Sequence, residues 1–399
     1  MAGDLCQKIP THIILFHILP RLPVESLQRC KSVCQQWRSF LKTRYFASMC
    51  NRRLTNGSTV DQSCHKLLFL PCYDNYEPGF RIMDCEAPDD GGGLSSQWNP
   101  LPFKYSGQDK IRIQTSLHGL VCICVQYEDW YRSKTELVLW NPLTRKYKML
   151  GKTNPHMESY FPEVRALGLY YSGMSDDDDK EYKLLTVSYK QSFHIYSLKS
   201  DSWRKVDLAD NYQTLISDLE LGWEMISDST WFNGNLYFLK GRLVLKFDTN
   251  VEKFTIIPTH PSLNDLDVKR MTMDVHKGVM HLGVHYETSQ HQNSKKAHIQ
   301  LWKMTEDENW DKVGVPFRID ISMYPFSRLR NKTWLMVESI KRGYFDKEEK
   351  KLHKVDYSKS YTKGKNCVTN AKSTQIISIY DSLAKVNYIE SFLSIDGSI

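Results

Sequence analysis

The side chains best suited to chemistry in this sequence are a run of aspartates and a group of histidines. Asp176 to Asp179 could bind Ca²⁺, but they lie in a polar stretch between two expected strands, which favours a solvated loop. His281, His285 and His291 could ligate a transition metal. On a strand, however, His281 and His285 would stand about 13 Å apart, which is too far for one ion. We therefore predict no metal and no cofactor.

Motifs for covalent or phosphate chemistry are missing from the sequence. It contains no G-x-S-x-G, no P-loop and no G-x-G-x-x-G pattern, and Gly91 to Gly93 lack a strand-to-helix context. The ten cysteines are scattered without a C-x-x-C pair, which argues against zinc. Several of them occupy apolar positions, as small core residues do. The chain is therefore not expected to be an enzyme.

The stretch from Ile9 to Met49 predicts closely spaced helices. Between Ile13 and Leu19 only one side chain is polar, so apolar groups surround the first helix and do not form a single stripe. Thr11 is expected to cap this helix and Pro20 to end it. Such a helix needs cover on more than one side.

Further helices are expected directly after the first. Pro23 suits the first turn of a helix that reaches Cys30, a third is predicted from Ser32 to Leu41, and a short one from Tyr45 to Arg53. About 40 residues are too few to bury this much apolar surface alone. The helices therefore either pack on the rest of the chain or dock into a groove of another protein.

The spacing of particular residues in this stretch resembles the F-box. The matching elements are Ile9-Pro10, Ile18-Leu19, Arg21-Leu22-Pro23, Ser26-Leu27, Cys30, Val33-Cys34, Trp37-Arg38 and Phe46. The resemblance implies docking onto a Skp-type adaptor and, through it, a cullin. It also implies adaptor-binding or packing positions at Pro10, Ile14, Leu15, Ile18, Leu19, Leu22, Pro23, Leu27, Val33 and Trp37.

The net charge of +7 arises in the N-terminal region. Residues 1–53 hold nine Lys and Arg against two acids, and the remainder has 44 residues of each sign. A neutral large region argues against an extended phosphate-binding surface, so nucleic acid is not an expected partner. The basic N-terminal region is expected to face an acidic protein or to stay solvated.

The expected compartment is the cytosol, the nucleus or both. The first ten residues lack a basic segment followed by an apolar run, so no signal peptide is predicted. No apolar stretch reaches the 18 residues or so that a membrane span requires, so no membrane partner is expected.

Five later segments share one layout, in which an alternating apolar strand ends in an aromatic residue and a polar turn leads to a second. These pairs are Trp140/Tyr147, Tyr196/Trp203, Phe247/Phe254, Trp302/Trp310 and Tyr380/Tyr388. Their spacing predicts β-hairpins. Steps of about 50 residues suit the four-stranded blades of a kelch-like β-propeller, with six or seven blades allowed by the length. A two-sheet β-sandwich is the alternative.

The order of these segments resembles the F-box-associated interaction domain of plant F-box proteins. The resemblance rests on WNPLTRKYKML, on the Gly168-Leu169 strand before Tyr182-Lys183-Leu184-Leu185, on WFNGNLYFL and on IISIYDSLAKVNYIESFLSI. The double glycine of strict kelch repeats is missing, so the kelch likeness is architectural.

We therefore expect a multidomain α+β chain. Residues 1–53 would form an all-α F-box, 54–64 a linker, and 65–399 an all-β propeller-like domain with a polar, exposed insertion at 341–373. The resemblance implies a substrate-recognition subunit of an SCF (Skp–cullin–F-box) ubiquitin ligase that recruits an unidentified target protein. The alternative is a protein-interaction scaffold, outside any ligase, whose F-box-like helices pack internally.

Overall fold

A computed structural model covers the whole chain. It describes residues 9–22, 24–43, 45–46, 49, 66–69, 79–84, 99–104, 110–128, 133–150, 164–172, 181–188, 192–206, 229–276, 278–289, 295–319, 323–328, 333–341, 348–356, 373–380 and 387–388. Pro23, the linker expected at 54–64, the aspartate run and His291 lie outside these residues.

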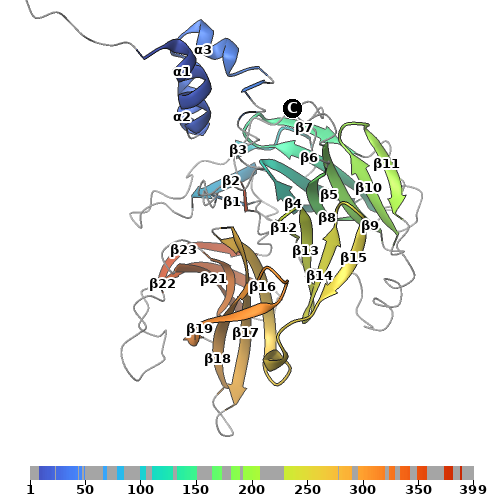
Figure 1. Cartoon of the computed structure of the whole chain (residues 1–399). Helices are drawn as coiled ribbons and strands as arrows, with labels where there is room; N and C mark the ends of the chain where they lie inside the picture. Colours follow the sequence, from blue (N-terminus) through green and yellow to red (C-terminus); the bar gives the residue numbers. More distant parts are fainter. Residues whose placement is uncertain are drawn as a thin grey trace, which may run out of the picture.

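Short helices open the chain and form a separate body at one end of the β-domain (Figure 1). The first helix is continuous but changes its geometry: α1 (Thr11–Ile13) passes into the π-helical η1 (Ile14–Ile18) and the 3₁₀ turn η2 (Leu19–Arg21). Then follow α2 (Val24–Cys30) and α3 (Gln35–Phe40).

Three details of these helices differ from the expectation. Pro10, not Thr11, is the N-cap of α1, and no side chain caps that end. Pro20 does not end the helix, because a proline is tolerated near the start of the 3₁₀ turn that runs to Arg21. The third helix begins at Gln35, since the Cys34 thiol accepts a hydrogen bond from the Trp37 amide at 3.5 Å and so caps it.

The strands of the described chain form six antiparallel four-stranded sheets. Sheet 1 joins β24 (Asn387–Tyr388), β1 (Lys66–Phe69), β2 (Gly79–Asp84) and β3 (Asn99–Pro100). Sheet 2 joins β4 (Lys110–Leu117), β5 (Leu120–Glu128), β6 (Ser133–Asn141) and β7 (Lys146–Met149). Sheet 3 joins β8 (Val164–Ser172), β9 (Glu181–Ser188), β10 (Phe193–Ser197) and β11 (Ser202–Val206).

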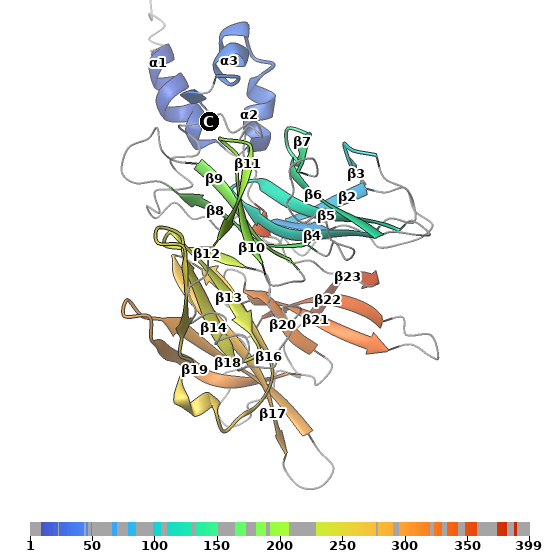
Figure 2. The ribbon, with the colours of Figure 1, turned by 90° about the vertical axis from the view of Figure 1, so that its right-hand side faces the viewer.

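The second half of the domain repeats this plan (Figure 2). Sheet 4 joins β12 (Thr230–Phe232), β13 (Asn235–Lys240), β14 (Leu243–Asp248) and β15 (Lys253–Ile257). Sheet 5 joins β16 (Asp267–His276), β17 (Val279–Ser289), β18 (Lys295–Met304) and β19 (Trp310–Ile319). Sheet 6 joins β20 (Met323–Arg328), β21 (Thr333–Lys341), β22 (Glu348–Asp356) and β23 (Ser373–Tyr380).

In the described part of the domain, hydrophobic cores lie between consecutive sheets from sheet 1 to sheet 5. Strand β5 shows why: Leu120, Cys122 and Cys124 belong to the core shared with sheet 3, whereas Val121, Ile123 and Val125 belong to the core shared with sheet 1. Alternate strand residues point to opposite faces, so a strand buried on both sides is apolar throughout. Similar cores join sheets 3 and 4 and sheets 4 and 5. This packing is that of a propeller and confirms the predicted fold class over the β-sandwich.

The first four predicted hairpins form, and the fifth does not. Cross-strand pairs join Trp140 to Tyr147, and corresponding pairs occur in sheets 3 and 4. Tyr380, however, ends β23 in sheet 6, whereas Tyr388 lies in β24 and pairs with Lys66 of β1. The segment crosses from the last sheet to the first and closes the ring. Aromatic spacing alone could not distinguish a hairpin from this crossing.

The prediction of an exposed insertion at 341–373 is wrong for part of this range. Residues Glu348–Asp356 form β22, which pairs with β21 on one side and with β23 on the other. The composition of this strand is strongly polar, so its sequence alone favoured an exposed segment. Backbone hydrogen bonding to two neighbours forms a strand whether or not its side chains are apolar.

Candidate docking surfaces

The helices have a hydrophobic core of their own. Leu15, Leu19, Leu27, Leu41 and Phe46 are buried together, and the side chains packed against them also belong to the helical region. In the described part of the chain, no residue of a sheet joins this cluster. The helices are therefore organised without cover from the β-domain.

Large apolar side chains remain exposed on the helices. Five of the eight exposed large apolar residues in the described part of the chain are Ile9, Ile13, Phe16, Val33 and Tyr45. This is a high concentration for so short a region, because isolated apolar residues on a surface are usually scattered. The first helix is apolar nearly all round, so burying one side of it leaves another side in water.

Phe16 is the aromatic centre of this exposed surface. Its ring packs edge-on against Phe40 at 5.2 Å and against Tyr45 at 5.9 Å, and Phe40 in turn contacts the buried Phe46. The ring of Phe16 is thus held in place by the core while 39% of the residue stays exposed. A positioned, half-exposed aromatic residue is well suited to be an interface anchor.

The ten residues predicted for adaptor binding fall into three groups. Pro10 and Val33 are exposed, and Ile14, Ile18, Leu22 and Trp37 are half-buried. Leu15, Leu19 and Leu27 lie in the helical core, where they stabilise the helices and cannot be reached by a partner of the folded chain. Pro23 lies outside the described residues. Val33 lies in the turn before α3 and not on the helix expected from Ser32.

Four exposed residues were missing from the prediction: Ile9, Ile13, Phe16 and Tyr45. For Ile13 and Phe16 the signal was present, since both belong to the apolar run from Ile13 to Leu19. The sequence could not show which side of that run would face the core. Ile9 belongs to the Ile9-Pro10 element of the F-box resemblance, and for Tyr45 we find no comparable signal.

The charged groups around these helices are mostly basic. Arg21, Arg29, Arg38 and Lys42 are exposed, and burial together with the nearby charge of Lys42 lowers the pKa of Lys31. Arg38 donates a hydrogen bond from Nε to the Lys31 carbonyl at 3.0 Å and so ties α3 to the end of α2. A partner of opposite charge would be attracted to this end of the molecule.

At the outer rim of the propeller, acidic residues join neighbouring sheets. Asp201, Glu252 and Glu308 each lie in the turn between the third and fourth strands of their sheet, with φ of 50°, 55° and 58°. They pair respectively with Lys148, Arg204 and Lys246 of the preceding sheet. Hydrogen bonds from Lys148 and Tyr196 lower the pKa of Asp201, and Glu252 raises the pKa of Arg204.

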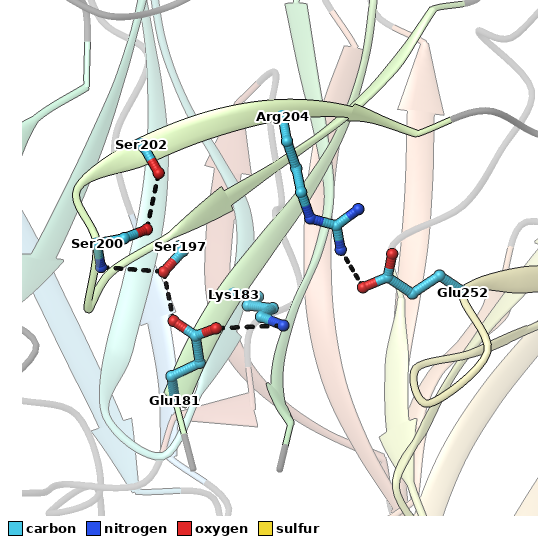
Figure 3. A network of polar contacts seen from close by, with 7 residues as sticks. All are labelled: Glu181, Lys183, Ser197, Ser200, Ser202, Arg204 and Glu252. Carbon is cyan, nitrogen blue, oxygen red and sulfur yellow. Dashed lines mark hydrogen bonds and ion pairs between the residues drawn. The ribbon is translucent and has the colours of Figure 1, made fainter. Parts of the chain in front are cut away.

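The hydroxyl groups in this region also serve the fold (Figure 3). Ser197 donates to Glu181, which pairs with Lys183 at 3.2 Å, and Ser197 accepts from the Ser200 amide at 3.1 Å. No histidine belongs to the network drawn, so Ser197 has no imidazole base beside it. These contacts fix the hairpin of sheet 3, and the separate ion pair between Arg204 and Glu252 joins sheet 3 to sheet 4.

The histidines considered for metal binding are buried on β17. His281 and His285 face Asp274 and Arg270 of β16 in the strand register. Within the described residues, no group of three His, Cys, Asp or Glu side chains is arranged to hold an ion. Among the helices that the structure describes, none combines the length and apolar character needed to cross a membrane.

Two protein families match the sequence. Residues 7–48 match the F-box domain, and residues 94–395 match the F-box associated beta propeller domain. Both families comprise non-catalytic proteins. The second match covers most of the chain and agrees with the six sheets described above.

Similar curated proteins come from Arabidopsis thaliana. A putative F-box only protein 15 is 27% identical over 62% of this chain and 58% of its own length. An F-box protein is 25% identical over 61% of each chain, and a putative F-box/kelch-repeat protein is 23% identical over 75% of this chain and 69% of its own length. The chain thus spans about three fifths of the length of the first two relatives.

Proposed function

Because this chain belongs to the F-box proteins that carry an F-box associated β-propeller domain, we propose that it is the substrate-recognition subunit of an SCF ubiquitin ligase. The helices dock on a Skp-type adaptor, which links them to the cullin. The propeller binds a target protein and holds its lysines near the ubiquitin-conjugating enzyme. The contribution to rate is proximity, since the chain itself supplies no reacting group.

One observation carries this proposal. The helices expose five large apolar side chains although they already have a core of their own. If the helices packed on the β-domain, as the alternative scaffold hypothesis requires, the sheets would cover these side chains. Apolar surface of this extent on a small region is expected to be covered by another protein.

Two valines allow a matched test. Val33 in the helical region is 60% exposed, and Val251 in a turn of sheet 4 is 62% exposed. We expect Val33→Asp in the full-length chain to weaken binding to a recombinant Skp-type adaptor by at least about tenfold, because a charge would be buried at the interface. Val251→Asp should bind as the unchanged chain does, and cullin capture should follow adaptor binding.

The opposite result has a clear meaning. If the folded full-length chain does not bind the adaptor, or if Val33→Asp and Val251→Asp bind it equally well, the proposal that this surface docks on a ligase adaptor is wrong. The scaffold alternative would then be favoured. The proposal also places the protein in the cytosol or the nucleus, which localisation of the tagged chain would check.

A further inference from the structure

The boundary between sheets 1 and 2 departs from the pattern of the three boundaries that join sheets 2 to 5. In sheets 3, 4 and 5 an acidic turn residue pairs with a base of the preceding sheet. The equivalent turn residue of sheet 2 is Arg145, which has the same left-handed backbone with φ of 58°. Like its counterparts, it lies two residues before the second aromatic residue of its hairpin. A base thus stands at the position where sheets 3, 4 and 5 have an acid.

Arg145 is exposed, and no described residue forms an ion pair with it. By analogy with Asp201, Glu252 and Glu308, it faces the preceding sheet, which here is sheet 1. The segment after β3 contributes a further exposed base, Lys104. This boundary therefore offers positive charge that the described part of the domain does not neutralise.

The same boundary exposes apolar surface. Tyr147 and Met149 of β7 are 42% and 41% exposed, whereas the equivalents of Tyr147 in sheets 4 and 5, Phe254 and Trp310, are buried. In sheet 1, the outer strand β3 that precedes this hairpin is only two residues long, whereas its counterpart in sheet 3, β11, has five residues. Phe103, which follows β3, is buried and contacts the Tyr147 ring at 5.6 Å.

Arg145 lies in the turn directly before β7, and Tyr147 and Met149 follow on one side of that strand, about 7 Å from each other, so the three residues form a short row. Lys148, between the last two, points the other way and pairs with Asp201 of sheet 3. The row combines one base with two apolar side chains at the open edge of an outer strand. An extended peptide with the same repeat could lie along it.

We propose that the exposed row of Arg145, Tyr147 and Met149, with the buried Phe103 behind it, binds an extended acidic segment of the target protein. A carboxylate of that segment pairs with Arg145 and supplies the acid that the three boundaries between sheets 2 and 5 obtain from the chain itself. An apolar side chain two residues away covers Tyr147 and Met149. The inference rests on the proposed role as a substrate receptor, and it states where the target binds and with what chemistry.

The test uses the full-length chain bound to its adaptor and a displayed library of random 12-residue peptides as the probe. We expect selected peptides to be enriched in Asp or Glu close to an apolar residue. Arg145→Glu and Tyr147→Ser should each weaken the binding of a selected, fluorescently labelled peptide by about tenfold or more. The controls Lys253→Glu and Val251→Ser change an exposed base and an exposed apolar residue on sheet 4 and should bind the peptide normally.

Three outcomes would overturn the inference: no enrichment of any peptide, enrichment without acidic residues, or binding that survives both substitutions in the row. Adaptor binding is measured separately for each variant, and the variants of the row should retain it. Failure of the unchanged chain to bind the adaptor would count against the ligase role, whereas peptide binding by the full-length chain alone would still support the row as a binding site. The two proposals can therefore fail independently.

Discussion

Replacing Phe16 by alanine should weaken adaptor binding by an amount that follows from its exposure. The residue is 39% exposed. A covered phenylalanine buries roughly 150–250 Å², so an adaptor that covers the rest removes roughly 60–100 Å² more. At about 25 cal/mol per Å² this contributes about 1.5–2.5 kcal/mol. The dissociation constant should then rise roughly 10- to 70-fold, since about 1.4 kcal/mol corresponds to a factor of ten.

The substitution also removes the ring contact between Phe16 and Phe40, which could loosen the helices. The control Phe40→Leu removes the same contact but keeps the exposed ring of Phe16. Binding of each full-length variant to the adaptor would be measured by isothermal titration calorimetry. We expect a loss of about threefold or less for Phe40→Leu, because an aromatic pair contributes only about 0.5–1.5 kcal/mol and part of the packing is kept.

Two results would refute this reasoning. An unchanged dissociation constant for Phe16→Ala would show that the adaptor does not cover the ring. An equal loss for Phe40→Leu would show that binding depends on the internal order of the helices and not on the exposed surface. Leu19→Ala is unsuitable as a surface probe, because that side chain is fully buried in the helical core and its removal should cost about 2–5 kcal/mol of stability.

Two further predictions concern the propeller. Gly168→Ala should lower the free energy of unfolding in urea by about 1–3 kcal/mol, because the added Cβ would lie 2.6 Å from Ser229 Oγ and 2.8 Å from Leu236 Cδ1. A second substitution, Ser229→Ala, should recover part of the lost stability, because it removes one of the crowding atoms. If the stability losses of the two substitutions simply added, crowding against Ser229 would not explain the effect of Gly168→Ala. Burial lowers the pKa of His118 to about 4 from 6.5, so folding stability should fall as the pH drops through this window, by at most about 1.4 kcal/mol per unit. His118→Asn, which suits the φ of 47°, should reduce that slope in urea unfolding at pH 7 and pH 5, and an unchanged slope would exclude His118 as its source.

The architecture could be predicted from the sequence where a physical pattern repeats. Four of the hairpins predicted from the aromatic spacing occur in the structure. Each outer pair of strands with a tight turn needs the same kinds of apolar residues and turn residues, so the pattern repeats in the sequence. The first helix could be predicted from the apolar run between Ile13 and Leu19, although Pro20 does not end it. Both patterns are local, so one sequence is enough to show them.

Whether a residue belongs to a functional surface depends on which other elements of the fold pack against it. Tyr147 and Phe254 occupy equivalent positions in the repeat, yet only Tyr147 is open, because β3 is short and its counterpart in sheet 3 is not. Similarly, Leu19 and Phe16 belong to one apolar run, and only the packed structure shows that the first is core and the second is surface. Exposure is a tertiary property, and the sequence carries no direct signal for it.

Ring closure links the proposed binding row to the far end of the chain. Sheet 1 contains β1, β2 and β3 from the start of the domain and β24 from its end, and the closing pairs are Lys66 with Tyr388 and Leu67 with Asn387. Phe103, which contacts Tyr147 of the row, follows β3 of this sheet. Any change that detaches β24 therefore acts on the sheet that supports Phe103, although the two segments are far apart in sequence.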